Sequence, residues 1–246
     1  MSSSRKAPVF ILFFWITAVI AIFGFVLFHQ TRKESREDSR EDRIGQMAED
    51  IRDGSEVFLV DPDSLPVWGE EDEVFGDTDG ESGSASDPYG AESDPPFGSS
   101  GSRSSGDPTY TLTSYGTISI PSIDLELPVW DGAGIIELRY GAGRMPLSCE
   151  AGYQGNLVIF GHRMRRYGSI FNRLGEVNVG DSISVSRKGS SYTYVVDETI
   201  TIDPSELSYY IGMQGEGDAC SITLITCTPI GVGTQRLLVI GHLRSS

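Results

Sequence analysis

Nearly all of the negative charge in this 246-residue chain is concentrated in one stretch, residues 32–110. That stretch has 7 basic and 22 acidic residues, a net charge of −15 within a chain total of −16. It is also rich in glycine, serine and proline, and such a segment buries too little apolar surface to offset the entropy that it loses on ordering. The sequence therefore predicts an acidic linker at 32–110, with the folded part confined to residues 111–246.

Two features of this linker point to local order. The charged run at residues 33–56 could continue as a helix. A linker that only connects two parts of a chain does not need apolar side chains. This one nevertheless has apolar residues at 57–60 and 65–68 and the aromatic residues Tyr89 and Phe97. Some of them could therefore dock on the folded domain.

The N-terminal part, residues 1–31, contains 20 consecutive residues without a charge, Val9–Phe28. As a helix, this run would cross the roughly 30 Å hydrocarbon core of a membrane. The alternative is a buried helix of a soluble protein, and we prefer a membrane span because the run is apolar on every face. Basic residues flank it on both sides, but the preceding tail is tiny and large domains translocate largely regardless of charge. We expect a single-pass membrane anchor with the folded domain outside the cell.

Residues 111–246 carry the pattern of an all-β domain, since short apolar runs alternate with turn signals. Many short strands of this kind close into a barrel or a sandwich. A hairpin turn is expected at 188–190, and helices are expected at 168–174 and 204–210. Asp203 is placed to cap the second helix, followed by a proline at its first position. The expected strands are 116–120, 126–130, 156–160, 182–186, 191–200, 220–227 and 235–241.

Composition also limits the chemistry. The net charge of −16 excludes a nucleic-acid-binding surface, which needs a basic patch. The three cysteines are too few for a disulfide scaffold and too scattered for a thiolate zinc site, and the three histidines exclude a histidine-rich metal centre. No cofactor and no metal is expected. Cys149 and Cys220 could pair as a disulfide outside the cell or remain two separate thiols.

Three residues at strand ends are candidates for catalysis. His162 follows the strand at 156–160, Cys227 ends the strand at 220–227, and Arg236 begins the next. A cysteine attacks as its thiolate, a nearby histidine lowers its pKa, and an arginine can stabilise an oxyanion. Each has an ordinary alternative: a surface histidine, an inert buried cysteine and a solvated arginine. The basic cluster at 163–166 either faces solvent or attracts an anionic partner, and His242 repeats the Gly-His pattern with a lower rank.

Four motifs, in order along the chain, resemble those of the sortases, membrane-anchored cysteine transpeptidases of mainly Gram-positive bacteria. They are GTISIPSIDLELPV at 116–129, GNLVIFGHR at 155–163, GSIFNRL with VGD at 168–181, and TLITCTP at 223–229 followed by Arg236 in QRLLVIG. The resemblance covers residues 115–243 and implies a closed eight-stranded β-barrel. It also implies that Cys227 is the nucleophile, His162 the general acid and base, and Arg236 the residue that orients the substrate and the oxyanion.

The resemblance further implies a reaction. Cys227 would cleave an LPXTG-like sorting signal between its threonine and glycine and form a thioester. An amine would then resolve the thioester, and hydrolysis would be a side activity. The partners would be surface or pilin proteins that carry the signal. The acceptor would be a lipid-linked wall precursor or a pilin lysine.

The motif around Cys227 is similar to that of class C sortases, which polymerise pilins. Asp87-Pro88-Tyr89, with a looser copy at 94–97, resembles the lid of that class, although a chance turn in the linker is the alternative. Class C enzymes usually have a second membrane helix after the domain, whereas this chain stops at Ser246, and Gln235 stands where that class often has histidine. Anchoring of surface proteins is therefore an alternative to pilus assembly. Two other functions stay open, a cysteine hydrolase of wall peptides and a non-catalytic membrane-tethered binding barrel.

Overall fold

The structure is a computed structural model that describes residues 20, 22–26, 41–61, 102–103, 109–163, 170–213 and 219–244. It divides into two units, residues 1–43 and 44–246. Residues 20 and 22–26 of the first unit are helical. Within the described ranges, no helix is both long and apolar enough to cross a membrane. Most of the expected span at 9–28, and all of the expected lid at 87–97, lie outside these ranges.

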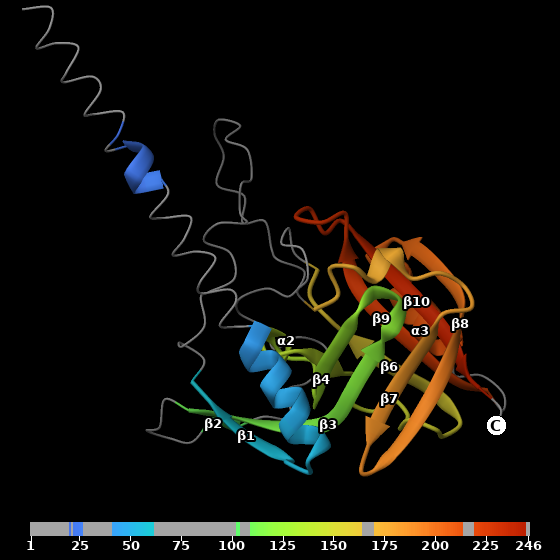
Figure 1. The fold of residues 1–246 in the computed structure, drawn as a ribbon. Coiled ribbons are helices and arrows are strands. Elements are labelled where there is room, and N and C mark those ends of the chain that lie inside the picture. The colour runs from blue at the N-terminus through green and yellow to red at the C-terminus, as the bar shows by residue number, and fades with distance from the viewer. Residues whose placement is uncertain are drawn as a thin grey trace, which may run out of the picture. The chain divides into compact units, whose positions relative to one another are not determined.

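The second unit is built on a closed barrel of eight strands (Figure 1). The barrel closes where the first strand, β3, pairs with β7 as well as with β4. The predicted all-β, eight-stranded barrel is thus confirmed. Around the barrel its strands are β3 (Tyr110–Ile120), β4 (Leu125–Asp131), β5 (Ala142–Arg144), β6 (Gly155–Phe160), β9 (Cys220–Thr228), β10 (Gln235–Leu243), β8 (Ser190–Ile202) and β7 (Ser182–Arg187).

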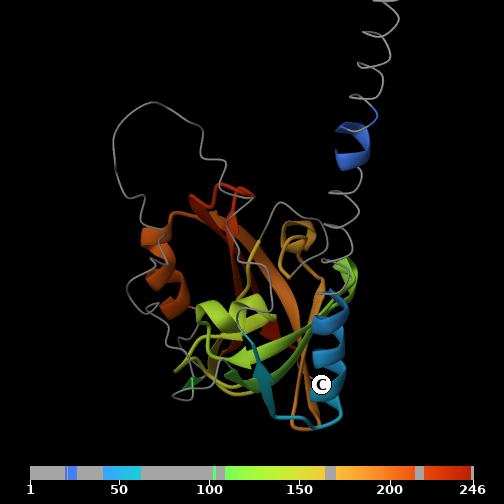
Figure 2. The same ribbon diagram turned by 90° about the vertical axis from the view of Figure 1, so that its left-hand side faces the viewer.

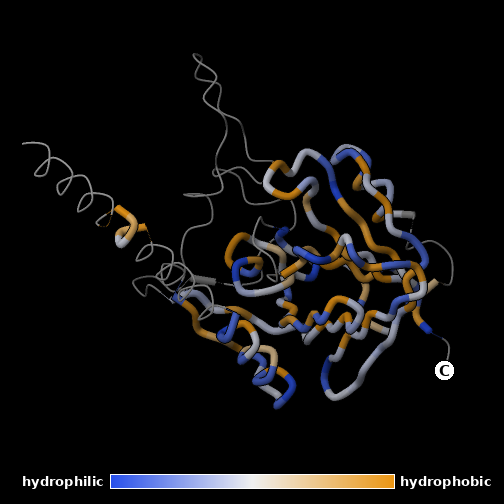
Figure 3. Tube along the Cα trace, turned by 45° about the horizontal axis from the view of Figure 1, so that its top comes forward, coloured by the Kyte–Doolittle hydropathy of each residue, from blue (hydrophilic) through white to orange (hydrophobic). Residues whose placement is uncertain are grey.

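The apolar residues of β6, β9 and β10 divide between two hydrophobic clusters. Leu157, Leu224 and Val239 belong to the larger cluster, which draws on strands all around the barrel. Their neighbours Phe160 and Leu238 belong to a second cluster. Successive residues of a strand point to opposite faces, so this part of the sheet is covered on both sides. Figure 3 shows the apolar segments gathered along the central strands.

Short helices complete the barrel. The second hydrophobic cluster includes Leu207 and Ile211 of helix α3 (Leu207–Met213). The 3₁₀ turn η4 (Pro204–Glu206) precedes α3, and Asp203 and Glu206 form a capping box there. This confirms the helix predicted at 204–210. The other short helices are η2 (Pro121–Ile123), α2 (Ile135–Arg139) and η3 (Leu174–Glu176).

The secondary structure predicted from the sequence differs from the structure in three places. The helix expected at 168–174 is wrong in its described part, because residues 170–173 are turn and only η3 follows. β3 begins at Tyr110 rather than at residue 116. Strand β5 was not expected, because three residues show no alternation. At its centre, a Cβ on Gly143 would lie 2.5 Å from the Gly132 carbonyl oxygen, so only glycine allows this close approach.

A helix over residues 41–52 and strand β1 (Val57–Val60) form what we call the N-terminal segment. β1 pairs antiparallel with β3, and β2 (Ser102–Arg103) also pairs with β3. The helix buries Ile44, Met47 and Ala48, and the Phe58 ring meets Trp130 edge-on with 5.3 Å between centroids. Figure 2 shows this helix and α3 on opposite sides of the barrel. The expected linker is therefore ordered at 41–61, which includes most of the charged run at 33–56 and the apolar residues 57–60. Residues 65–68, Tyr89 and Phe97 lie outside the described residues.

Candidate active site

The chain leading to His162 is held tightly at Gly161, just after β6. The Gly161 amide donates to the Ile225 carbonyl oxygen at 3.1 Å, and the Thr226 hydroxyl donates to the Gly161 carbonyl oxygen at 2.7 Å. A Cβ on Gly161 would lie 2.5 Å from the ring of Phe171, so glycine is required here. These contacts fix the backbone of the residue just before His162.

His162 and Cys227 lie at the same end of two neighbouring strands. β6 and β9 run parallel, and the last pair of their ladder joins Phe160 to Ile225. His162 and Cys227 each follow that pair by two residues. Adjacent strands are about 4.8 Å apart, so this equal offset places the two residues side by side at the edge of the barrel.

Arg236 lies opposite Cys227 on the other side. The two residues are direct partners in the antiparallel ladder of β9 and β10. Directly opposed residues project from the same face of a sheet, so the side chains of Arg236 and Cys227 leave the sheet on the same side. Arg236 is only 3% exposed, and its Nη1 donates to the carbonyl oxygens of Gly233 at 2.7 Å and Gln235 at 3.0 Å.

The face that carries this pair is the one turned away from the barrel interior. The next ladder pair on that face is Ile225 with Leu238, and both belong to the second hydrophobic cluster with Leu207 of α3. Asp203 also lies close to Arg236. Its pKa is lowered chiefly by hydrogen bonds from Ser205, and the charge of Arg236 contributes a smaller effect. The candidate site therefore sits beside an apolar surface formed by the sheet and α3.

Arg163 is a residue whose part in the site the sequence did not reveal. Its Nη1 donates to the Thr228 hydroxyl at 3.0 Å, and its Nε donates to the Asn172 carbonyl oxygen at 3.3 Å. Burial lowers the pKa of its guanidinium. Arg163 thus ties the residue after His162 to the residue after Cys227. Arg165 and Arg166 of the same cluster lie outside the described residues.

The remaining candidates are elsewhere. His242 is paired through Nδ1 with Asp197 at 2.6 Å, and its ladder partner Ser221 is near the start of β9, away from Cys227. Cys220 is the first residue of β9, and Cys149 lies in the loop before β6. Asp87, Pro88 and Tyr89 lie outside the described residues. Within the described ranges, no group of three or more metal-binding side chains is found.

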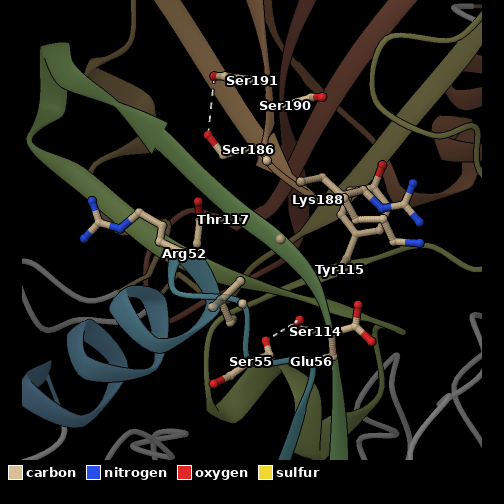
Figure 4. Close-up of a pocket in the computed structure, with 15 residues that line it drawn as sticks. Arg52, Ser55, Glu56, Ser114, Tyr115, Thr117, Ser186, Lys188, Ser190 and Ser191 are labelled. Atoms are coloured by element: carbon tan, nitrogen blue, oxygen red, sulfur yellow. Dashed lines mark hydrogen bonds between the residues drawn. The ribbon is translucent and has the colours of Figure 1, made fainter.

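A cavity of about 350 Å³ lies away from the candidate site, between the N-terminal segment and the barrel (Figure 4). It is lined by the turn after the helix at 41–52, by β3 and by the hairpin of β7 and β8. Hydroxyl groups bond across its walls, from Ser186 to Ser191 at 3.3 Å and from Ser114 to the Ser55 carbonyl oxygen at 3.2 Å. None of His162, Cys227 and Arg236 lines this cavity.

A thiol, an imidazole and a buried guanidinium in one row can support acyl transfer. The thiolate is the reactive form of cysteine, and it forms covalent acyl intermediates. An imidazole can move protons near neutral pH. A guanidinium is permanently charged and can hold a carbonyl oxygen as negative charge develops on it.

Known proteins match the same part of the chain. Sortase A of Listeria monocytogenes is 35% identical over 131 residues, which is 53% of this chain and 57% of that protein. Among solved structures, a lid mutant of sortase A from Corynebacterium diphtheriae is 31% identical with a TM-score of 0.51, covering 55% of this chain and 72% of that one. Sortase C of Streptococcus pneumoniae, described in terms of catalysis and pilin substrate specificity, is 27% identical with a TM-score of 0.50, covering 54% and 67%.

The chain spans little more than half the length of the first of these relatives. The family model for the sortase domain matches residues 118–244, about half of the chain, and this range contains the barrel from within β3 to the end of β10. The four motifs, the barrel topology and this match agree, and the chain belongs to the sortase family.

Proposed function

We propose that this chain is a cysteine transpeptidase with Cys227 as the nucleophile, His162 as the general acid and base, and Arg236 as the residue that holds the reacting carbonyl. One observation carries the proposal. His162 and Cys227 follow the last pair of adjacent parallel strands by the same two residues, and Arg236 faces Cys227 across the next ladder. Nucleophile, proton carrier and cation thereby form one row across β6, β9 and β10.

The proposed reaction has two half-reactions. The Cys227 thiolate attacks the threonine carbonyl carbon of an LPXTG-like signal, and the guanidinium of Arg236 stabilises the oxyanion. The bond to glycine breaks as His162 gives a proton to the leaving amine. A thioester on Cys227 remains. An acceptor amine attacks that thioester, His162 takes its proton, and the thiol is restored.

The setting of Arg236 suits this task. Its Nη1 is held by two backbone carbonyl oxygens. A guanidinium has five N–H donors, of which three are on the other two nitrogens. A group already fixed in position loses little freedom when charge develops in the transition state, so its interaction with the oxyanion is used efficiently.

We further propose that residues 9–28 anchor the chain in the membrane and that the barrel works on the outer surface of the cell. The acceptor defines two versions of the function, a wall-precursor amine for anchoring surface proteins or a pilin lysine for pilus assembly. The relatives named sortase A and sortase C leave both versions in place.

We also propose that Asp87-Pro88-Tyr89 is a lid over Cys227. A lid is named in the Corynebacterium sortase A structure. Deleting residues 85–98 should raise the rate at which a thiol reagent labels Cys227, measured against labelling of the denatured chain. An unchanged rate would rule out a lid in this segment.

The test of the main proposal is intact-mass spectrometry of the full chain in detergent with an LPXTG peptide. We expect an acyl adduct on Cys227 that a glycine or lysine amine discharges into a ligated peptide. Cys227→Ala should lose both the adduct and the ligated product and stay folded. Cys220→Ala, which removes a thiol from the other end of the same strand, should keep both.

Other outcomes separate the alternative functions. An adduct that only water discharges would identify a cysteine hydrolase. The absence of an adduct, also after deletion of residues 85–98, would contradict catalysis and favour a binding barrel. Transfer activity in Cys227→Ala would contradict the assigned nucleophile.

A further inference from the structure

Serine and threonine side chains form a regular array on three adjacent strands of the barrel, β3, β7 and β8. Residues that oppose each other across a ladder project from the same face of the sheet, and alternate residues along a strand share that face. Two neighbouring rows of ladder partners consist only of hydroxyl-bearing residues, which are Thr117, Ser186 and Ser191 in one row and Ser119, Ser184 and Thr193 in the other. We call these six residues the hydroxyl face.

The hydroxyl face is on the outside of the barrel. Ile118 and Val185, which lie between its members along β3 and β7, are fully buried in the larger hydrophobic cluster. Because successive residues of a strand point to opposite faces, the hydroxyl groups point away from that cluster. A face of this kind offers hydrogen bonds to water or to a polar ligand.

The cavity of about 350 Å³ lies at one end of the hydroxyl face (Figure 4). The row of Thr117, Ser186 and Ser191 forms one wall, and the turn at 54–56 and the hairpin at 187–190 form the others. This volume is at the lower end of the roughly 300–1,000 Å³ that is typical of small-molecule sites. The cavity is therefore large enough to take part of a ligand whose remainder lies along the face.

Thr117 is the residue that points to a ligand in this cavity. It is only 4% exposed, and within the described part of the chain its side chain has no hydrogen bond. Its ladder partner differs, because the Ser186 hydroxyl donates to the Ser191 hydroxyl at 3.3 Å. A hydroxyl group carries one donor and two acceptor lone pairs. The contents of the cavity thus have to supply the partners of Thr117.

The charges around the cavity favour a neutral ligand over an anion. Two of its arginines already have carboxylate partners outside the lining. Arg52 pairs with Glu126 at 3.1 Å, and Arg187 pairs with Glu150. Neither arginine therefore adds an uncompensated positive charge to the cavity.

Two charged residues of opposite sign remain in the lining, Lys188 and Glu56. Among the described residues, neither has an ion pair. An ammonium group only donates hydrogen bonds and a carboxylate only accepts them. A ligand that satisfies both, together with the hydroxyl groups, needs many donors and acceptors but no net charge, and a sugar has hydroxyl groups that do both.

We propose that the cavity and the hydroxyl face form a binding site for a sugar chain. One sugar unit enters the cavity beside Thr117, and the next units lie along the face toward Ser119. The two rows are separated by two residues along each strand, about 6.6 Å, so they offer successive hydrogen bonds to an extended chain. The source is a glycan strand of the cell wall, which rests on the proposed location outside the membrane. The site would hold the barrel against the wall and take no part in the chemistry at Cys227.

The test is a titration of a fluorescently labelled tetrasaccharide of N-acetylglucosamine with the full chain in detergent, followed by fluorescence anisotropy. We expect saturable binding. Thr117→Val removes the hydroxyl group and keeps the shape of the side chain, so it should weaken binding by about 2–10-fold without lowering the melting temperature. Lys188→Met, which removes a charged donor from an exposed turn, should weaken binding at least as much.

Thr199→Val is the matched control, because it removes an exposed hydroxyl group of β8 outside the face and the cavity. Its affinity should stay within about twofold of the unsubstituted chain, which is the lower limit for loss of a hydrogen bond. Absence of saturable binding, or equal affinities in all three variants, would overturn the proposal. Displacement of the tetrasaccharide by millimolar inorganic phosphate would show an anion site and would also overturn it.

A second measurement tests the source of the sugar chain. The full chain should sediment with cell-wall glycan from which protein has been removed, and the soluble tetrasaccharide should release it. A chain that binds the tetrasaccharide but does not sediment with the glycan would contradict the wall as the source.

Transfer activity keeps this proposal separate from the proposed function. Cys227→Ala should bind the tetrasaccharide as tightly as the unsubstituted chain, and Thr117→Val should transfer an LPXTG peptide to a glycine amine at an unchanged rate. Binding in a chain that forms no acyl adduct would leave the sugar site standing without the transpeptidase. An active chain that does not bind the tetrasaccharide would do the reverse.

Discussion

The two ends of β9 each carry a cysteine, yet their surroundings differ in kind. Cys227, at one end, faces the buried Arg236 and precedes Thr228, whose hydroxyl is bonded to Arg163. Cys220, at the other end, lies near Cys149, whose pKa burial raises to about 11. Cationic side chains favour a thiolate, whereas burial favours the neutral thiol.

The difference shows that the neighbouring strands and loops, not the strand itself, decide what a cysteine does. At the Cys227 end the ladder of β6 and β9 stops two residues before His162 and Cys227, so these two residues are not paired with each other through the backbone. At the Cys220 end the loop is bonded back to Tyr115 and Tyr194. The Cys227 end carries the residues that we propose for catalysis, whereas the Cys220 end lies beside a loop that is fixed by hydrogen bonds.

The largest expected loss of transfer rate in this comparison comes from a substitution of Arg236. Arg236→Lys keeps the positive charge but cannot reproduce a guanidinium that is bonded to two carbonyl oxygens and is proposed also to hold the substrate carbonyl group. Loss of one oxyanion donor typically costs about 10²–10³ in kcat. We expect a loss of that size in the rate of peptide transfer, measured by chromatography of the ligated product.

An arginine near the Cys220 end of β9 provides the control for Arg236→Lys. Arg187, which pairs with Glu150 beside Tyr115, is the matched arginine there. Arg187→Lys should leave the transfer rate within about twofold, since it lies remote from the row of candidate residues. Equal losses in the two variants would show that Arg236 contributes stability rather than catalysis.

The next largest loss of stability and activity is expected from a substitution of Gly161, the residue before His162. In Gly161→Ala the new Cβ would lie 2.5 Å from the Phe171 ring. Overpacking of this kind costs about 1–3 kcal/mol, and the shift that relieves it would also move His162. We expect a lower melting temperature together with slower transfer, measured by thermal unfolding and by the peptide assay.

Gly212→Ala on α3 is the matched substitution. Among the described residues outside its own helix, no atom lies within 4 Å of the new Cβ there, and alanine favours a helix over glycine by up to about 1 kcal/mol. That variant should keep or raise the melting temperature and keep its activity. A Gly161→Ala chain that behaves like Gly212→Ala would mean that the contact with Phe171 does not position His162.

A smaller effect is expected from the bond between Arg163 and Thr228. A hydrogen bond to a charged group contributes about 1.5–3 kcal/mol, and part of that is recovered by solvent at this half-buried site. Arg163→Met and Thr228→Val should each lower kcat/KM by about 5–30-fold. The double variant should be no worse than the poorer single variant, because both remove one interaction. Losses that multiply would show that the two side chains act separately.

Much of the fold was predictable because its signals are local. Seven of the barrel strands show short apolar runs between turns, and the capping box of Asp203 and Glu206 marks the start of η4 and α3. The N-terminal segment was foreseen only as a possible helix and as apolar residues that could dock, because averaging over residues 32–110 favoured a linker. Its helix has Ile44, Met47, Ala48 and Ile51 at helical spacing, but the surrounding acidic residues dominate the composition.

The candidate site was predictable only in part. Cys227 and Arg236 belong to one hairpin, so their pairing follows from sequence proximity. His162 comes from a strand about 60 residues earlier that joins β9 in parallel, and spacing alone cannot reveal such a partner. The family resemblance supplied it. For Arg163 the sequence predicts either a solvated cluster or one that attracts an anionic partner, and neither includes the bond to Thr228, which depends on the same long-range pairing.

The smallest expected effect is a difference between the two ends of β9 in how stability depends on pH. At the Cys220 end, a hydrogen bond from Arg187 lowers the pKa of Glu150 below its ordinary value of 4.5. A lowered pKa means that the ion pair stabilises the fold fully above pH 4.5 and that this contribution is lost as the pH falls through the lowered value. The Glu150 side chain is 46% exposed, so solvent screening limits the contribution to roughly 0.2–1 kcal/mol.

Glu150→Gln should therefore lower the melting temperature slightly at pH 7 and not at pH 3, measured by unfolding scans across that range. The matched carboxylate at the Cys227 end is Asp203, whose pKa is lowered mainly by hydrogen bonds from Ser205. Asp203→Asn keeps a side-chain acceptor for the Ser205 amide and should change stability less with pH than Glu150→Gln does. If the two variants responded equally to pH, the ion pair at the Cys220 end would carry no electrostatic share of the stability, and the loop would be held by its tyrosine contacts alone.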